Sequence, residues 1–375
     1  MEFALTPEQD MLRDTARRFL EDKAGMPVVR DLMETEAGFD EGLWAEIAAQ
    51  GWQAMAVPEE YGGAGFTHLE SCILMEEMGR SLFPSPYLSS IVLGAELVLV
   101  AGSAEQKAEL LPDVASGETR LALAHLEPGG GWEEGDIAMP ASPNGDDFVL
   151  DGVKSFVIDG HTADRLIVVA QVPGSGISLL LVDGDASGVT RRRIETMDMT
   201  RKQAEITFEA VRVPGSALVG EPGSAWGHLE DTLRRAVVAL AYEQVGGAQV
   251  CMDMAVGYAK ERVQFGRPIG SFQAIKHTCA DMLVQVEAAR STAYHAGHAA
   301  IGDDPGELVI AAALAKSYCS EAFFFCAGEN IQIHGGIGFT WEHDAHLYFK
   351  RAKTDELLFG APAHHRALLA AGLGL

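Results

Sequence analysis

Two glycine-bearing segments in the C-terminal third of the chain carry residue types that suit the binding of a phosphorylated ligand. One runs from Arg262 to Gln273 (RVQFGRPIGSFQ) and the other from Gln332 to Phe339 (QIHGGIGF). Glycines let backbone N–H groups approach a phosphate closely, and a fixed Arg beside them can pair with its charge. Each segment follows a run with helical periodicity, so an ordinary loop that ends a helix is the alternative explanation for either segment alone.

One acidic residue, Glu243, lies in an otherwise apolar helical run over residues 236–245 (AVVALAYEQV). Burial destabilises the charged form of a carboxylate, which suits a general base that works near neutral pH. The alternative is that Glu243 pairs with an Arg or anchors a polar network inside a helical bundle, because structural ion pairs use the same residue types. The sequence leaves both interpretations open.

The elements that must position these residues begin with helices. Thr6 and Gln9 form one capping box and Ser103 and Gln106 form another, so a helix is expected after each. The second of these helices is expected to end before Pro112. Residues 1–117 are therefore predicted to be all helical, apart from a loop rich in glycine and proline over residues 57–65.

After residue 117 the sequence pattern changes from helical to β-structure, and after residue 222 it becomes helical again. Short β-rich runs separated by turn residues predict an antiparallel β-domain over residues 118–222. Long apolar-periodic runs at about 227–261, 271–300 and 305–329 predict an antiparallel helical bundle over residues 223–375. The fold class is thus α+β with three domains, in the order helical, β, helical bundle.

The composition describes a globular protein. The chain has 375 residues, of which 47% are hydrophobic, and a formal net charge of −26 that repels nucleic acid and the anionic face of a membrane. The five cysteines are scattered without a C-x-x-C pair or clustered histidines, so we expect reduced thiols and no metal site. The chain lacks a signal peptide and an uncharged apolar span of about 18 residues, so we expect a cytoplasmic protein without membrane or nucleic-acid partners.

Taken together and at this spacing, the two glycine-bearing segments resemble the signature regions of the acyl-CoA dehydrogenase family. The resemblance extends in order along nearly the whole chain and includes residues 54–63 (AMAVPEEYGG) and the pair Glu127-Pro128. It implies that FAD is the cofactor and that an acyl-CoA is the substrate. In this family a carboxylate takes the α-proton and the flavin takes the β-hydride, while the protein supplies positioning and electrostatics.

The resemblance also assigns residues to the cofactor. Arg262, Phe265 and Gln273 match positions that hold the diphosphate and adenine half of FAD. A second set matches a segment that reaches a flavin bound mainly by a neighbouring subunit, and its members are Gln332, Gly335 and Gly336. Shared FAD sites and a homo-oligomer, either a dimer or a tetramer, are therefore implied.

The sequence departs from the family pattern at the catalytic position. Phe359 occupies the place of the usual Glu, and a phenyl ring cannot accept a proton, although the backbone N–H at 359 is retained. Ala236 occupies the place of the base that some members carry on the preceding long helix. Glu243 lies seven residues further along that helix and is the candidate for a relocated base.

The β-domain departs from the pattern as well. Leu126 and Ile158 stand where threonines commonly contact the flavin, and Phe156 stands where a Trp often shields the ring. Flavin contacts from this domain are therefore expected to be apolar or made by the backbone.

The expected activity is dehydrogenation of an acyl-CoA to the trans-2-enoyl-CoA, with electrons passed to an electron-transfer flavoprotein. The missing base and hydroxyls also resemble subunits of bacterial heteromeric acyl-CoA dehydrogenases that act on steroid side-chain thioesters. The alternatives are therefore a non-catalytic partner subunit of a heterotetramer and a flavin oxidase or monooxygenase on the same scaffold.

Overall fold

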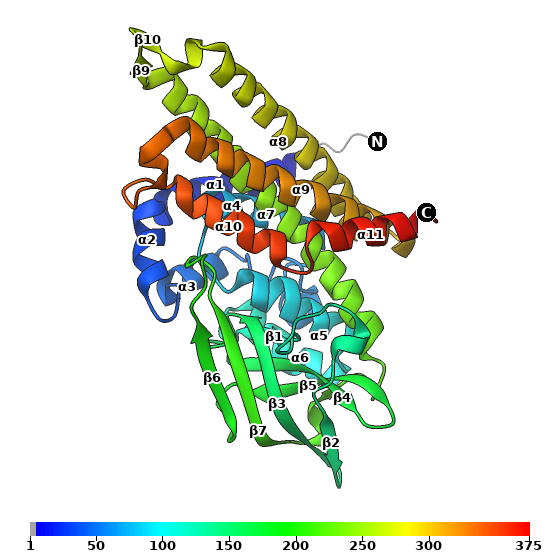
Figure 1. The fold of residues 1–375 in the computed structure, drawn as a ribbon. Coiled ribbons are helices and arrows are strands. Elements are labelled where there is room, and N and C mark those ends of the chain that lie inside the picture. The colour runs from blue at the N-terminus through cyan, green and yellow to red at the C-terminus, as the bar shows by residue number, and fades with distance from the viewer. Residues whose placement is uncertain (1–4) are drawn as a thin grey trace. The chain divides into compact units, whose positions relative to one another are not determined.

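The computed structural model describes residues 5–375, which group into two compact units (Figure 1). The helical unit comprises the described residues through Asp31 together with His68–Phe83 and Val237–Leu375. The mixed unit comprises Leu32–Thr67 and Pro84–Ala236. The chain enters each unit more than once, so neither unit is one continuous segment of sequence.

The helical unit is built around long helices that pack along one another. Helix α9 packs against α8, α10 and α11, and α1 packs against α4. Figure 1 shows α8 and α9 running side by side. The helices with residues in this unit are α1 (Pro7–Lys23), α2 (Met26–Glu34), α4 (His68–Ser81), α7 (Ala225–Glu261), α8 (Gln273–Ala300), α9 (Pro305–His334), α10 (Ala345–Leu357) and α11 (Pro362–Gly372).

The predicted capping boxes are confirmed. Thr6 Oγ1 accepts a hydrogen bond from the backbone N–H of Gln9, and the Gln9 side chain accepts one from the backbone N–H of Thr6. The Ser103 box starts α6 (Ala104–Ala115) in the same way. The predicted end of this helix before Pro112 is wrong, because α6 continues through Pro112. Burial of Leu110, Leu111 and Val114 stabilises the last turns and outweighs the backbone hydrogen bond that proline cannot donate.

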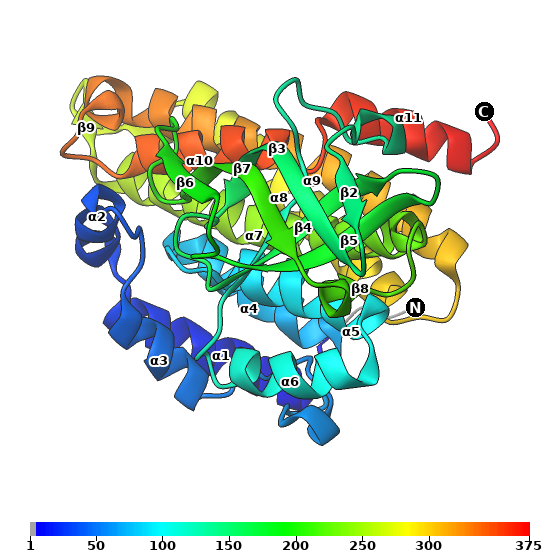
Figure 2. The same cartoon turned by 90° about the horizontal axis from the view of Figure 1, so that it is seen from below.

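The mixed unit contains two four-stranded sheets in the orders β1-β4-β5-β8 and β2-β3-β7-β6. Their pairings are antiparallel except that β1 pairs with β4 in parallel. Figures 1 and 2 show β3 and β7 lying across β4 and β5 in a second layer. The strands are β1 (Leu121–Ala124), β2 (Ala141–Asn144), β3 (Asp147–Ile158), β4 (Arg165–Val172), β5 (Gly176–Asp183), β6 (Val189–Ile194), β7 (Gln203–Val213) and β8 (Leu218–Val219).

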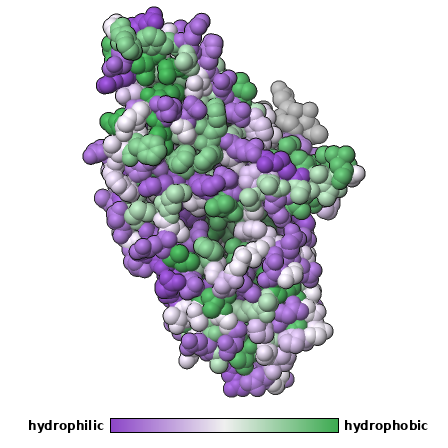
Figure 3. Space-filling model, in the orientation of Figure 1, coloured by the Kyte–Doolittle hydropathy of each residue, from purple (hydrophilic) through white to green (hydrophobic). Residues whose placement is uncertain are grey.

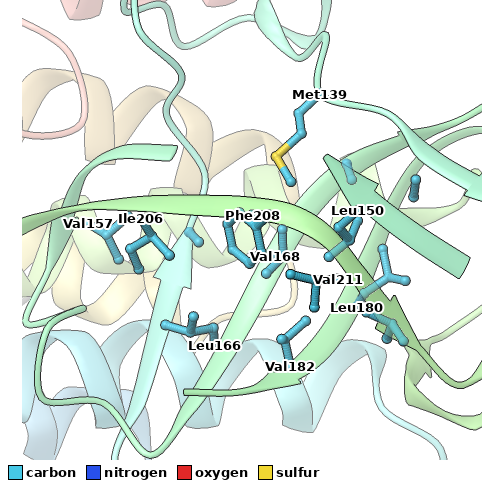
Figure 4. Close-up of a cluster of buried hydrophobic side chains, with 14 of the residues drawn as sticks. Met139, Leu150, Val157, Leu166, Val168, Leu180, Val182, Ile206, Phe208 and Val211 are labelled. Atoms are coloured by element: carbon cyan, nitrogen blue, oxygen red, sulfur yellow. The ribbon is translucent and has the colours of Figure 1, made fainter. Parts of the chain in front are cut away.

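Alternate residues of these strands form the core of the mixed unit (Figure 4). Leu166 and Val168 of β4 pack with Ile206 and Phe208 of β7, because successive side chains of a strand point to opposite faces of its sheet. Short helical elements complete the unit, namely α3 (Glu41–Ala49), η1 (Glu59–Tyr61), η2 (Leu88–Ala95), α5 (Glu96–Ala101), α6, η3 (Glu134–Asp136) and η4 (Gly215–Ala217). Helix η1 lies inside the predicted loop over residues 57–65.

One helical stretch of the described residues, Pro305–Phe339, is long and apolar enough to cross a membrane by length and composition. However, 61% of its most apolar window is buried inside the protein, as expected for a core helix of a bundle. Among residues 5–375 no group of three or more His, Cys, Asp or Glu residues is arranged to hold a metal ion. The five cysteines are free thiols, and four of them are buried.

Replacing Phe208 in the mixed-unit core should destabilise the protein. Phe208→Ala removes a ring that is 1% exposed, and we expect the free energy of unfolding to fall by about 3–5 kcal/mol. Urea denaturation measures this difference. The neighbouring exposed substitution Glu209→Ala should change stability by less than about 0.5 kcal/mol. Equal stability of the two variants would contradict the assignment of the core.

Candidate functional site

The segment from Arg262 to Gln273 forms a tight hairpin between α7 and α8. Strands β9 (Val263–Gln264) and β10 (Arg267–Pro268) pair in antiparallel fashion. Phe265 and Gly266 form the corner with φ angles of 53° and 77°, as the two-residue type I′ turn requires. The turn therefore holds Phe265 at a positive φ, which is unfavourable for a bulky residue. Phe265 is 91% exposed.

Backbone hydrogen bonds fix the base of this hairpin, whereas the charged side chain of Arg262 is exposed. The N–H of Arg262 donates to Tyr258 O and the N–H of Ile269 donates to Arg262 O, each at 2.8 Å. The Arg262 side chain is exposed, and within residues 5–375 its guanidinium forms no ion pair. Gln273 is the exposed first residue of α8. Figure 3 shows hydrophobic atoms at the end of the helical unit where Figure 1 places this hairpin.

The second predicted segment begins inside α9 rather than after it. Gln332 is an exposed residue of the last helical turn, and Gly335 ends the helix with φ 64°. A Cβ atom on Gly335 or Gly336 would meet no atom of the chain within 4 Å. By contrast, a Cβ on Gly338 would lie 3.0 Å from Ile331 O. Packing within the chain therefore does not require glycine at 336, which leaves an open backbone surface that a ligand can approach.

Stacked rings bring the two segments together. The ring of His334, at the end of α9, stacks on Tyr258 near the end of α7 with 4.3 Å between centroids. His334 Nδ1 is 2.8 Å from Asn330 O and donates to it in the neutral tautomer that fits this contact. Burial lowers the pKa of His334, so its ring is neutral near pH 7. An exposed Arg, a strained aromatic residue and two open glycines thus share one end of the helical unit, and this set suits a dinucleotide diphosphate.

The predicted flavin contacts of the mixed unit lie around the end of β1 and a bulge in β3. The N–H of Ser155 donates to Leu126 O at 2.8 Å, which ties the two places together. Phe156 lies in the bulge with φ 54° and is 49% exposed. Ile158 is the last residue of β3 and is buried.

A buried ion pair fixes the same region. Lys154 Nζ donates to Glu127 Oε1 at 2.8 Å and to His125 O at 3.0 Å. Burial opposes ionisation of Glu127, but hydrogen bonds from Lys154 and from the N–H groups of Met139 and Ala138 outweigh it and lower the pKa of the carboxyl. The Glu127-Pro128 pair that carries the family resemblance therefore has a structural task in this chain.

His125, which directly precedes Leu126, is a polar residue that was not predicted from the sequence. Its side chain is buried, and neither ring nitrogen has a hydrogen-bond partner among the described residues. Burial, and next the nearby charge of Lys154, lowers the pKa of His125 to about 4. A polar residue in the apolar run LALAHL was the only available signal in the sequence.

Glu243 is buried in α7 and paired with Arg351 of α10. The distance from Arg351 Nη1 to Glu243 Oε1 is 2.5 Å, and both side chains are 2% exposed. The Glu243 carboxylate thus lies in direct contact with a buried positive charge. The contact therefore favours the structural ion pair over the relocated base.

Phe359 is held in place by side chains from two other helices. His365 Nε2 on α11 donates to Phe359 O at 2.8 Å. Lys316 Nζ on α9 donates to the carbonyls of Asp355 at 2.7 Å and Glu356 at 3.0 Å, which belong to the last turn of α10. Burial lowers the pKa of Lys316 to about 8 and that of His365 to about 4. Phe359 itself is buried and has φ 58°.

Backbone strain coincides with the residues that the sequence singled out. Among the described residues other than glycine, six have positive φ, and three of these are Phe156, Phe265 and Phe359. Strained backbone persists only where the surrounding structure enforces it, and it is concentrated at functional sites. Three of the strained positions thus fall at residues that the sequence singled out.

The fold and these segments define the class of the protein. Models of the N-terminal, middle and C-terminal domains of acyl-CoA dehydrogenase match residues 6–118, 122–211 and 226–374. The chain belongs to the acyl-CoA dehydrogenase family. It is therefore an oxidoreductase that acts on a CH–CH group, and its cofactor is FAD.

Individual relatives share the whole length of the chain. The acyl-CoA dehydrogenase IpdE2 of Mycobacterium tuberculosis is 38% identical over 361 residues, which are 96% of this chain and 95% of that protein. A chain in the structure of the electron transferring flavoprotein of Acidaminococcus fermentans is 31% identical, with a TM-score of 0.93 and 100% and 99% coverage. A chain of the Tcur3481-Tcur3483 steroid acyl-CoA dehydrogenase is 33% identical, with a TM-score of 0.88 and 98% coverage of each chain.

Removing one partner of the buried ion pair should destabilise the protein severely. Glu243→Gln removes the carboxylate charge that faces the buried Arg351 guanidinium, and we expect a loss of about 3–5 kcal/mol in the free energy of unfolding. The matched control is Glu321→Gln, which breaks an exposed pair with Arg366 and should cost at most about 1 kcal/mol. A Glu243→Gln protein as stable as this control would show that the pair is dispensable, and would return Glu243 to the candidates for a base.

The low pKa of His365 predicts a pH dependence of stability. Its pKa of about 4 in the folded protein lies below the unfolded value near 6.5, so its contribution is present above pH ~6.5 and is lost as the pH falls towards 4. His365→Gln retains a donor for Phe359 O but does not titrate. Between pH ~7 and ~5 the variant should lose roughly 1–2 kcal/mol less unfolding free energy than the wild type. Urea denaturation at each pH measures this, and identical pH profiles would refute it.

Proposed function

We propose that this chain is a subunit of an FAD-dependent acyl-CoA dehydrogenase in which a paralogous partner chain supplies the catalytic base. The proposal rests on the side chains at the three positions where a catalytic base was expected. Phe359 and Ala236 have no acidic group, and the carboxylate of Glu243 is engaged with Arg351 in a buried ion pair. The reaction would convert an acyl-CoA to its trans-2-enoyl-CoA.

Two segments of the helical unit would hold the FAD diphosphate. Arg262 supplies positive charge for the FAD diphosphate, and Phe265 presents an exposed ring next to it. The open backbone at Gly335 and Gly336 permits close approach of a cofactor shared with another subunit. When bound, FAD supplies the hydride-accepting chemistry, and the protein supplies binding, orientation and exclusion of water.

The relatives support the finer parts of the proposal. The name of the Tcur3481-Tcur3483 steroid acyl-CoA dehydrogenase joins two designations. This name favours a heteromeric assembly and a bulky acyl-CoA substrate for the present chain. Another belongs to the structure of an electron transferring flavoprotein, which favours such a protein as electron acceptor. We place the assembly in the cytoplasm as a heterotetramer. A homo-oligomer with a base at another position is the competing arrangement.

Co-expression with a paralogous acyl-CoA dehydrogenase chain tests the proposal. The two chains should co-purify with about one flavin per two chains, and substrate should bleach the flavin only in the complex. If the chain alone binds one flavin per chain and is bleached by an acyl-CoA, the partner requirement is refuted. Peroxide release without an added acceptor would instead indicate an oxidase.

Arg262 should contribute strongly to FAD affinity. Arg262→Ala removes a charge-assisted contact worth about 1.5–3 kcal/mol, so the Kd for FAD should rise about 10- to 100-fold. Flavin fluorescence during titration of the apo-assembly measures this change. Arg192→Ala, which removes an exposed Arg paired with Glu205 on the mixed unit, is the control and should leave the Kd unchanged. An unaltered Kd in Arg262→Ala would contradict the assignment of the hairpin to FAD.

A further inference from the structure

We infer that Tyr258, His334 and His343 are positioning residues whose packed rings hold the two FAD-binding segments of the helical unit together as one pre-formed site. This inference rests on the proposed function, because it takes the Arg262 hairpin and the glycines after His334 as the contacts of the FAD diphosphate. The three side chains act on the cofactor through the backbone that they hold.

Tyr258 links the first segment to the second. It lies one helical turn before Arg262, and its carbonyl oxygen accepts a hydrogen bond from the N–H of Arg262 at 2.8 Å. Its ring stacks on the ring of His334 with 4.3 Å between centroids and 28° between planes. His334 directly precedes Gly335, at which α9 ends. One side chain therefore connects the base of the hairpin with the start of the glycine-bearing segment.

A second ring contact joins the two ends of the glycine-bearing segment. The ring of His343 packs against that of His334, with 4.3 Å between centroids and 50° between planes. These two histidines stand on either side of residues 335–342, so their contact closes this stretch into a loop. His343 is itself anchored, because its Nδ1 accepts the N–H of Ala345 at 3.1 Å and its carbonyl oxygen accepts a hydrogen bond from Arg30 at 3.0 Å.

Near the two open glycines this loop has little other side-chain support. Ile337 and Phe339 are 47% and 74% exposed. Gly335 and Gly336 have no side chain, and a Cβ atom on either would meet no atom of the chain within 4 Å. A loop that is not held in place must be ordered when its ligand binds, and this entropic cost weakens binding. The contact between the two histidines avoids part of that cost.

The ring of His334 acts by packing and not by charge. Burial lowers the pKa of His334, so the ring is neutral near pH 7 and does not attract a diphosphate as a cation would. Its Nδ1 donates to Asn330 O at 2.8 Å, which fixes the ring against the last turn of α9. A packed ring pair stabilises its arrangement beyond the area that it buries, by an amount that corresponds to about 2- to 10-fold in affinity where the pair orders a binding site.

The test is a double-mutant cycle on FAD binding, made in the assembly in which the wild type binds FAD. Tyr258→Leu and His334→Leu each remove one ring, and the combined variant removes both, whereas Tyr258→Phe and His334→Phe keep a ring at each position. Methionine replaces leucine where a leucine variant does not fold. The Kd for FAD is measured by flavin fluorescence, and the melting temperature is measured for each apo-assembly. The control is Phe349→Leu, which removes a ring from the pair with Phe324 in the same unit.

Tyr258→Leu and His334→Leu should each raise the Kd for FAD about 3- to 10-fold. The combined variant should raise it no further than the larger single effect, because both substitutions remove the same contact. His343→Leu should raise the Kd by a similar factor, since it opens the loop at its other end. The two phenylalanine variants should stay within about twofold of the wild type. Phe349→Leu should lower the melting temperature of the apo-assembly and leave the Kd unchanged.

Three results overturn the inference while leaving the proposed function intact. In the first, the effects of Tyr258→Leu and His334→Leu on the Kd multiply in the combined variant, so the rings do not act through their mutual contact. In the second, Tyr258→Phe raises the Kd as much as Tyr258→Leu, so the hydroxyl carries the effect. In the third, the leucine variants lower the melting temperature and keep the wild-type Kd, so the rings serve stability alone. If the wild-type assembly binds no FAD at all, the proposed function fails together with this inference.

Discussion

The side chains of Glu243 and Arg351 form a fully buried ion pair between α7 and α10. Helix α7 is the long helix that continues into the β9–β10 hairpin, and α10 is the helix that ends just before Phe359. Each charge offsets the other in a low-dielectric interior, so the pair links the two helices. The same contact engages the one carboxylate that the sequence offered as a replacement base. One buried contact thus both joins the two helices and occupies this carboxylate.

Other buried charges of the helical unit follow the same rule. Glu77 of α4 receives two hydrogen bonds from Arg17, and Glu76 is bonded to Arg290 and to the hydroxyl of Tyr294. Burial raises the pKa of Glu76, while the nearby Arg290 opposes this shift. Despite the net charge of −26, these interior acids therefore have cationic partners, and the excess negative charge lies on the surface. Such pairing is the condition under which a bundle tolerates buried carboxylates.

The strained phenylalanines show how the scaffold has been adapted. Phe265 is forced to positive φ by the hairpin, and Phe156 by the bulge in β3. His365 holds the carbonyl of Phe359, and Lys316 holds the carbonyl of Asp355 at the end of α10. Gly360 follows at φ 98°, and a Cβ there would lie 2.7 Å from the His364 ring. Phe359 thus has a strained backbone conformation although its side chain cannot act as a base.

The sequence by itself determined the order and type of the elements, because capping boxes, turn residues and hydrophobic periodicity act over a few positions. It also singled out the glycine-bearing segments at Arg262–Gln273 and Gln332–Phe339 as candidate cofactor contacts, and it showed that Phe359 stands where the family carries an acid. Its errors were local as well: α6 extends through Pro112, and one pair of strands is parallel. Only the tertiary structure showed that Glu243 pairs with Arg351, because this partner lies 108 residues away in the chain. The same holds for His125, since whether a buried nitrogen has a partner depends on contacts between distant segments, which no local pattern encodes.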